Sequence, residues 1–321
     1  MKHWTLDDMK SQEGKVAIIT GGSSGIGFHA ALELARKGAR VIIASDDVDK
    51  GILALKMIAD QVPHADITFE PLDLADLESV KVFSSRMRSS LSSLDILILN
   101  GGIAGIPKRM ETASGFEMHL AVNYLGHFAL SAYLFPLLTE VADSRVVAVG
   151  SLDHHHAQVN FKDLQLKKNY QATKAYAQSK LALMLFSFEL HRRAKGRGLF
   201  IKSLAVHPGA VRTHIFDRGP EISRSYYHPE AILKRLSIKT FGQSPEKGAL
   251  PILFAATSRD AKSGEYYGPD GFMELWGNHP VKVKLAIQAS NLTAAGRLWE
   301  ESERLTKAQF RFEGMGLSHH H

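Results

Sequence analysis

The feature that most constrains the fold is a glycine-rich turn between a short apolar run and an amphipathic stretch. The run Lys15–Thr20 is apolar and rich in β-branched residues, which predicts a buried strand. G-G-S-S-G-I-G follows from Gly21 to Gly27, and an amphipathic stretch then continues to Lys37, before Gly38. Glycines let a ligand approach the backbone, and a helix N-terminus offers free N–H groups to a phosphate. Strand, turn and helix in this order therefore predict a dinucleotide-binding unit.

The same alternation continues along the chain. Short apolar runs predict six further strands, at Val41–Ala44, Ile67–Phe69, Asp95–Leu99, Ser144–Gly150, Phe200–Val206 and Gly264–Gly268. Amphipathic or apolar stretches between them predict helices. This rhythm predicts an α/β protein with a doubly wound (Rossmann), mainly parallel seven-stranded sheet and helices on both faces. Ligands of such sheets bind at the carboxyl ends of the strands.

The chain is predicted to form one domain over residues 1–321, because it shows no internal repeat, linker or low-complexity tract. Residues 15–213 would form the cofactor and catalytic core, and residues 243–310 would complete the fold. Residues 214–242 lack clear strand periodicity and combine Tyr226 and Tyr227 with apolar side chains, which predicts a lid over the substrate. His319–His321 are typical of a purification tag and are excluded.

Composition narrows the function classes. The absence of cysteine excludes disulfides, a thiolate nucleophile and a cysteine-ligated metal. The formal charge is +6, and the basic clusters His191–Arg197 and Val281–Lys284 lack interleaved aromatic residues, which favours solvated faces over a nucleic-acid site. Met1–Gly14 is polar, unlike a signal peptide, and no apolar run suggests a membrane span. We expect a cytoplasmic protein without nucleic-acid or membrane partners.

A second group of residues predicts acid–base chemistry. Tyr176 and Lys180 in Y-A-Q-S-K are four positions apart and so share one helix face. A lysine beside a phenol favours the phenolate and lowers the tyrosine pKa. Ser151, at the end of a predicted strand, is placed to hold a substrate oxygen. Alone, such a pair is usually a half-buried ring and a solvated charge, and Tyr170 with Lys174 repeats the spacing.

Taken together, these motifs resemble the short-chain dehydrogenase/reductase family, and in particular its retinol-dehydrogenase-like and WW-domain-oxidoreductase-like members. Thr20–Gly27 matches the family turn T-G-x-x-x-G-x-G, and Tyr176 with Lys180 matches Y-x-x-x-K. The further matches are Asp73-Leu74 to D-[VL], Leu99–Gly102 to a weakened N-N-A-G, Asn123 opening N-Y-L-G-H-F, Ser151 at the catalytic-serine position, and Pro208–Thr213 to P-G-x-V-x-T. Later similarities, such as G-E-Y-Y-G-P-D-G, extend the resemblance over nearly the full chain.

The resemblance implies a role for each matching residue. Tyr176 would be the general acid/base, Ser151 would polarise the substrate oxygen, and Asn123 would hold a water that relays protons. Lys180 would bind the nicotinamide ribose and lower the pKa of Tyr176. The implied cofactor contacts are Gly21, Ser23, Ser24, Gly25, Ile26, Gly27, Asp46, Asp73, Leu74, Asn100, Gly101, Gly102, Tyr176, Lys180, Pro208, Gly209, Val211 and Thr213.

The expected activity is hydride transfer between a nicotinamide dinucleotide and a secondary alcohol or carbonyl of a fairly lipophilic small molecule. The alternative is a catalytically silent dinucleotide-binding sensor or scaffold on the same fold, although such proteins usually lose the tyrosine, lysine or serine.

NAD is the expected cofactor, and NADP stays possible. Asp46 lies 19 positions (46 − 27) after Gly27, where an acidic group accepts hydrogen bonds from the adenosine ribose. The alternative role for Asp46 is an N-cap for the next helix. NADP-using relatives carry a basic residue at the position of Asp46 or of Ser24. If Asp46 points to solvent instead, Lys50 or Arg40 is free to reach a 2′-phosphate.

Two expectations concern the surroundings of the site. Leu181–Phe188 and Ala121–Leu138 are apolar nearly all round, and apolar surface beyond the needs of sheet packing predicts a homodimer. His154–His156 make a poor metal site, because adjacent residues cannot all face one ion. We expect no metal, and histidines at the rim of the substrate pocket.

Overall fold

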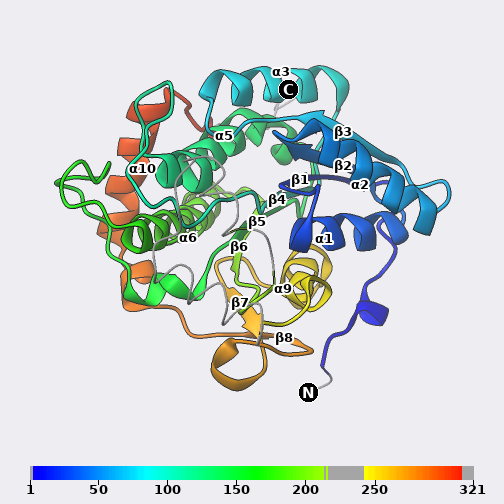
Figure 1. Ribbon diagram of the computed structural model, residues 1–321. Helices are drawn as coiled ribbons and strands as arrows, with labels where there is room; N and C mark the ends of the chain where they lie inside the picture. The colour runs from blue at the N-terminus through cyan, green and yellow to red at the C-terminus, as the bar shows by residue number, and fades with distance from the viewer. Residues whose placement is uncertain (1–2, 213–214, 216–241, 313–321) are drawn as a thin grey trace, which may run out of the picture.

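The computed structural model describes residues 3–212, 215 and 242–312, and its centre is an eight-stranded sheet. The strands lie in the order β3-β2-β1-β4-β5-β6-β7-β8, with helices against both faces (Figure 1). They are β1 Val16–Thr20, β2 Arg40–Ser45, β3 Ile67–Pro71, β4 Ile96–Leu99, β5 Arg145–Val149, β6 Lys202–Val206, β7 Tyr266–Pro269 and β8 Pro280–Lys282. Strands β1 to β7 are parallel. The predicted doubly wound α/β fold is confirmed.

The strand count differs from the prediction by one. Strand β8 pairs antiparallel with β7, with Val281 opposite Gly268. It has three residues and begins at a proline, which suits the edge of a sheet. The basic cluster Val281–Lys284 that we interpreted as a solvated face thus contains a short edge strand, too short and too polar to produce a strand pattern.

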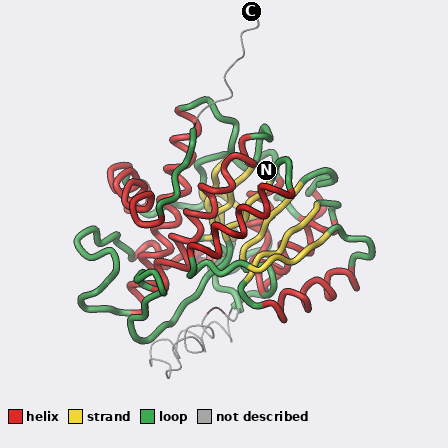
Figure 2. The backbone as a smooth tube through the Cα atoms, turned by 90° about the horizontal axis from the view of Figure 1, so that it is seen from above, coloured by secondary structure: helices red, strands yellow, loops and turns green. Residues whose placement is uncertain are grey.

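Two groups of helices form the outer layers, and Figure 2 shows the strands between them. One core lies between the sheet and α1 Gly25–Arg36, α2 Val48–Gln61 and α9 Pro245–Thr257. The other lies under α3 Leu77–Ser90, α5 Gly126–Thr139, α6 Ala172–Gly196 and α10 Leu292–Thr306. Short helical turns complete the described chain: η1 Leu6–Asp8, α4 Met118–Leu120, η2 Ala121–Leu125, η3 Leu152–His156, η4 Phe272–Glu274 and η5 Ile287–Ser290.

The chain reverses its direction of travel across the sheet beside β1. This strand pairs with β2 on one side and with β4 on the other, both in parallel. The connections on the two sides of such a switch point run in opposite directions and leave a crevice at the carboxyl ends of the strands. The glycine turn after β1 and the turn after β4 both open into this crevice.

The helical stretch that contains the apolar residues Ala121–Leu138 is interrupted near its start. Residues Ala121–Leu125 form a π turn, η2, in which the N–H of Gly126 bonds to the carbonyl of Ala121, five residues back. A π turn inserts one extra residue into the helix and is frequent at functional sites. It places Asn123 on the widened part of the helix, fully buried.

The apolar surface of α5 and α6 is covered within the chain. Trp299 of α10 lies 5.2 Å from Phe128 and 5.7 Å from Phe186, between ring centroids. Phe310, which follows α10, lies 4.5 Å from Trp299. The apolar residues that led us to predict a homodimer are thus packed under the protein's own C-terminal helix, so the homodimer stays a prediction without that support.

Among the described residues, one helical stretch is long and apolar enough to cross a membrane, contrary to our interpretation of the sequence. It is Met118–Thr139, and 83% of its apolar window is buried inside the protein. A buried core helix meets the same criteria of length and composition as a membrane span. The packing of α5 against the sheet, α3 and α10 accounts for its apolar character.

Candidate active site

A pocket of about 520 Å³ opens at the carboxyl ends of β1, β2 and β4. Eleven of the predicted cofactor contacts line it: Gly21, Ser23, Ser24, Gly25, Ile26, Asp46, Asp73, Leu74, Asn100, Gly101 and Gly102. The lining also contains Lys50, which we considered as a partner for a 2′-phosphate, and residues that the sequence did not single out, among them Ile103, Met118 and Val122. The apolar members belong to no motif, so only their position in the fold identifies them.

The glycine turn has the geometry that a dinucleotide phosphate requires. Gly21 and Gly25 have φ angles of +63° and +57°, in the left-handed region that favours glycine. A Cβ on Gly27 would overlap the carbonyl oxygen of Gly21. Helix α1 begins at Gly25, so its first N–H groups point toward the pocket. These residues fit a bound pyrophosphate.

At the end of the pocket where the adenosine ribose is expected, two neighbouring carboxylates have different roles. Asp47 is the N-cap of α2 and accepts a hydrogen bond from the N–H of Lys50 at 3.0 Å. The capping role that we considered for Asp46 therefore belongs to Asp47, whereas Asp46 is exposed and lines the pocket. The Nζ of Lys50 lies 2.8 Å from Asp47, and Arg40 begins β2 at the end away from the pocket.

The turn after β4 is fastened to β1 by a threonine. The Oγ1 of Thr20 accepts hydrogen bonds from the N–H groups of Asn100 and Gly101, both at 2.9 Å. The Nδ2 of Asn100 donates to the carbonyls of Thr20 and Gly21, at 3.0 and 3.1 Å. The weakened N-N-A-G motif is thus held by hydrogen bonds although its first Asn is Leu99.

Two of the four predicted catalytic residues, Asn123 and Lys180, lie beside this turn, and the other two lie together. Tyr176 and Lys180 lie on α6, Ser151 follows β5, and Asn123 lies in η2. The phenol of Tyr176 and the hydroxyl of Ser151 are hydrogen bonded. A Cβ on Gly102 would lie 3.0 Å from the Oδ1 of Asn123 and 3.5 Å from the Nζ of Lys180, so both polar groups face the cofactor turn.

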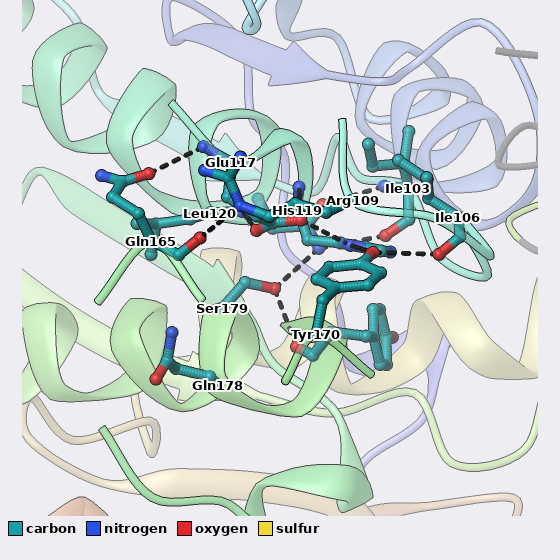
Figure 3. Close-up of polar contacts among 12 residues, drawn as sticks. Ile103, Ile106, Arg109, Glu117, His119, Leu120, Gln165, Tyr170, Gln178 and Ser179 are labelled. Carbon is teal, nitrogen blue, oxygen red and sulfur yellow. Dashed lines mark hydrogen bonds and ion pairs between the residues drawn. The ribbon is translucent and has the colours of Figure 1, made fainter. Parts of the chain in front are cut away.

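A fifth residue, Ser179, joins Asn123 to the catalytic helix. The Nδ2 of Asn123 donates to the Oγ of Ser179 at 2.9 Å and to the carbonyl of Ile103 at 3.0 Å. The hydroxyl of Ser179 donates in turn to the carbonyl of Tyr176, at 2.7 Å. Figure 3 shows Ser179 and Ile103 in this network. The amide of Asn123 therefore positions α6, and its Oδ1 also accepts from the N–H of Ile103, at 2.8 Å.

The pKa of Tyr176 departs from its usual value in the direction opposite to our expectation. Burial raises it, the negative charge of Asp153 raises it further, and the hydrogen bond with Ser151 opposes them. Lys180 does not offset this rise, and its Nζ donates to the carbonyl of Val149 at 2.9 Å. Burial lowers the pKa of Lys180 itself from 10.5 to about 8.

Tyr170, the second tyrosine with the Y-x-x-x-K spacing, has a structural role. It precedes α6 and donates a hydrogen bond from its hydroxyl to the carbonyl of Ile106, at 2.9 Å (Figure 3). Its oxygen also lies 3.3 Å from the Nδ1 of His119, which contacts the buried carboxylate of Glu117 at 3.0 Å. His119 stacks edge-on to Tyr176, with ring centroids 6.3 Å apart. No motif in the sequence pointed to Glu117 or His119.

The three consecutive histidines are not all at a pocket rim. His154 is fully buried, and its Nδ1 donates to the carbonyl of Ser151 at 2.7 Å. Its Nε2 then accepts from the N–H of Ala286, at 3.4 Å. Burial lowers the pKa of His154 to about 4, so it supports the catalytic serine as a neutral ring. His156 is exposed.

The segment after β6 contributes less to the pocket than predicted. Pro208, Gly209 and Val211 do not line it, and neither do three other predicted cofactor contacts, Gly27, Tyr176 and Lys180. Gly209 has a φ of +73°, and a Cβ there would lie 2.5 Å from the carbonyl oxygen of Leu275. The turn therefore packs against η4. Thr213 and nearly all of the proposed lid, residues 214–242, lie outside the described residues.

Within the described part of the chain, one group of side chains brings three metal-type donors within 4.8 Å of one another. It consists of His3, Asp270 and His279, of which the first two are exposed. The group lies between the N-terminus and the β7–β8 connection and contains none of the catalytic residues.

Comparison with known proteins identifies the family. Residues 15–221 match the short chain dehydrogenase family. Retinol dehydrogenase 12 of Bos taurus is 45% identical over 291 residues, which are 90% of this chain and 85% of that protein. Polyprenol dehydrogenase of Danio rerio is 35% identical and covers 94% and 89% of the two chains. A solved structure of an uncharacterised protein from Mycobacterium paratuberculosis is 34% identical, with a TM-score of 0.78 and coverage of 97% and 100%.

The chain therefore belongs to the short-chain dehydrogenase/reductase family. Within that family it is retinol-dehydrogenase-like, as the resemblance of its motifs predicted. It is accordingly an NAD(P)-dependent enzyme that acts on CH–OH or C=O groups, and a nicotinamide dinucleotide is its cofactor.

Proposed function

We propose that the protein interconverts an alcohol and a carbonyl on a fairly lipophilic small molecule, with Tyr176 as general acid/base and NAD(H) as preferred cofactor. Two observations carry the proposal: Tyr176 and Ser151 are hydrogen bonded to each other, and Lys180, one turn along α6 from Tyr176, lies beside Gly102, which lines the cofactor pocket. Acid–base chemistry on a substrate oxygen needs a proton donor and a second polar group within hydrogen-bond reach. Tyr176 and Ser151 supply both.

The protonation state of Tyr176 favours carbonyl reduction near neutral pH. Burial and Asp153 raise the pKa of its phenol, so the hydroxyl keeps its proton and can donate it to a carbonyl oxygen. The cofactor, when bound, supplies the hydride to the carbonyl carbon. Ser151 polarises the same oxygen through its hydroxyl group, and the carboxylate of Asp153 lies 3.2 Å from the Oγ of Ser151.

Two observations support a lipophilic substrate. Relatives at 45% and 35% identity are named as dehydrogenases of retinol and polyprenol, which are primary alcohols on apolar chains. The loop after β7, which packs on the Gly209 turn, exposes Phe272 and Met273 at 68% and 70%. The substrate class that we propose therefore includes primary as well as secondary alcohols and their carbonyls.

A catalytically silent dinucleotide sensor is the second candidate, and turnover distinguishes the two. We would incubate the protein with NADH or NADPH and a panel of apolar aldehydes and ketones, and follow nicotinamide absorbance. Tyr176→Phe should lower kcat by about 10²- to 10⁴-fold with cofactor binding retained, as expected for loss of a general acid. Tyr170→Phe is the matched control and should keep most of the activity. A wild-type protein that binds cofactor but turns over no member of the panel would favour the sensor.

A further inference from the structure

His127 is a fully buried histidine outside the predicted site, and both of its ring nitrogens are hydrogen bonded. It lies in the first turn of α5, immediately after the π turn η2. Its Nε2 is 2.9 Å from the Oγ1 of Thr20, and its Nδ1 is 3.1 Å from the main-chain carbonyl oxygen of Asn123. The ring therefore connects β1 to the residue that positions the catalytic helix.

Counting donors and acceptors determines where the protons lie. The carbonyl of Asn123 can only accept, so the Nδ1 of His127 carries a hydrogen. The Oγ1 of Thr20 already accepts from Asn100 and Gly101, and its two acceptor positions are thereby filled. Its single proton is directed either to the Nε2 of His127 at 2.9 Å or to the carbonyl of Ile98 at 3.3 Å, and the shorter contact is favoured.

The chain of hydrogen bonds therefore has one direction, from the Thr20 hydroxyl to Nε2 and from Nδ1 to the Asn123 carbonyl. Burial lowers the pKa of His127 to about 3, and the nearby charge of Lys180 acts in the same sense, whereas the bond to Asn123 opposes them. The ring is thus neutral throughout the working range of pH, as this arrangement of donors and acceptors requires.

Each end of this chain holds a different part of the site. Thr20 fixes the N–H groups of Asn100 and Gly101, which line the cofactor pocket. Asn123 bonds Ser179 on α6, one residue before Lys180. The two ends are 103 residues apart in sequence (123 − 20), and the imidazole joins them directly.

We propose that His127 is a positioning residue, which holds the cofactor turn and the Asn123–Lys180 side of the catalytic group in one fixed relation through its hydrogen bonds to Thr20 and Asn123. His127 does not line the cofactor pocket and acts through these two neighbours. This chain of hydrogen bonds does not conduct protons to the solvent, because Thr20 and His127 are both fully buried. The inference rests on the proposed function insofar as turnover is its second readout.

Two variants of His127 test its two hydrogen bonds separately, because each variant can keep one bond and lose the other. In His127→Asn, the amide N–H can replace Nδ1–H toward Asn123 while the acceptor for Thr20 is lost. In His127→Gln, the amide oxygen can replace Nε2 toward Thr20 while the donor to Asn123 is lost. His127→Ala removes both and is the reference for a complete loss.

The readouts are the Kd of NADH from a fluorescence titration and kcat with the best carbonyl substrate. A lost hydrogen bond of ordinary strength changes an equilibrium by about two- to tenfold. We expect His127→Ala to weaken NADH binding by about threefold or more and to lower kcat by about tenfold. Asn should restore kcat but not binding, and Gln should restore binding but not kcat.

Equal losses of NADH binding and kcat in the Asn, Gln and Ala variants would show that His127 only fills space. Wild-type Kd and kcat in a folded Ala variant would refute the proposal. The binding measurement is independent of turnover, so it remains decisive even if the proposed reaction is wrong. If the variants do not fold, ¹⁵N NMR of histidine-labelled wild-type protein decides. We expect a His127 signal with a bare Nε2 that does not titrate between about pH 5 and 9; a ring protonated at Nε2 would refute the chain.

Discussion

Lys180 is expected to lower the stability of the cofactor-free protein while serving the reaction. Its Nζ is buried and donates a hydrogen bond to the carbonyl of Val149. Burial lowers its pKa from 10.5 to about 8, so the folded state disfavours the charged form. At about 1.4 kcal/mol per pH unit, this fall corresponds to roughly 3 kcal/mol of lost stability below pH 8.

Lys180→Met removes the charge and keeps most of the side-chain volume. The loss of the bond to Val149 costs about 1 kcal/mol, so the variant should be more stable than wild type by about 2 kcal/mol at pH 7. For a chain of this length, that is a rise in Tm of about 3 °C. The unfolded state holds the lysine proton up to its pKa of 10.5, so wild-type stability recovers between pH 8 and 10.5. The difference between the two proteins should therefore be near zero at about pH 10.

The measurement is a pair of denaturation curves for wild type and Lys180→Met at pH 7 and pH 10, without cofactor, with kcat measured in parallel. Other groups that titrate in this range contribute equally to both proteins and cancel in the difference. We expect a stability gain at pH 7 together with a large loss of turnover. A variant that is less stable than wild type at pH 7, by an amount that does not change at pH 10, would refute the burial argument.

Three further predictions test the site more widely. Asp46→Arg should shift the ratio of kcat/KM for NADH and NADPH toward NADPH by about tenfold. The reason is that a carboxylate near a 2′-phosphate at an exposed position costs about 1–2 kcal/mol of binding free energy. A tenfold wild-type preference for NADPH would overturn the assignment. Gly27→Ala should abolish cofactor binding through overlap with backbone, whereas Gly296→Ala, where the added Cβ has no neighbour within 4 Å, should not; equal binding by both variants would contradict this. Tyr170→Phe should lower stability by about 1 kcal/mol through one lost hydrogen bond, and a loss of turnover as large as that of Tyr176→Phe would reverse their roles.

The fold was predictable because its signals are local. A short apolar run reveals a strand such as β1, and a glycine turn before an amphipathic stretch reveals the start of α1. Strand β8 gave no such signal, since Pro280–Lys282 is short and lies at an edge. The covering of α5 and α6 by Trp299 was also not predictable, because an apolar helix face does not specify whether its own chain or a second copy packs on it.

The site was predictable where a motif carries a residue's chemistry, and not where a contact between distant segments does. Tyr176, Ser151 and Asn123 were found by spacing and resemblance. The bond between Thr20 and His127 joins residues 107 positions apart, and no spacing rule in the sequence relates them. The pKa of Tyr176 was misjudged for the same reason, because its direction depends on burial and on Asp153 rather than on the neighbouring lysine alone.

The pair Asp46 and Asp47 shows how a single residue's register determines a functional assignment. From the sequence, Asp46 could either cap the next helix or face the cofactor. Strand β2 ends at Ser45 and α2 begins at Val48, so Asp47 occupies the N-cap. The carboxylate of Asp47 also forms an ion pair with the Nζ of Lys50, at 2.8 Å. This ion pair engages the cation that could otherwise bind a 2′-phosphate. Asp46 stays exposed on the pocket wall, and the preference for NAD(H) that we propose depends on where one strand stops and one helix starts.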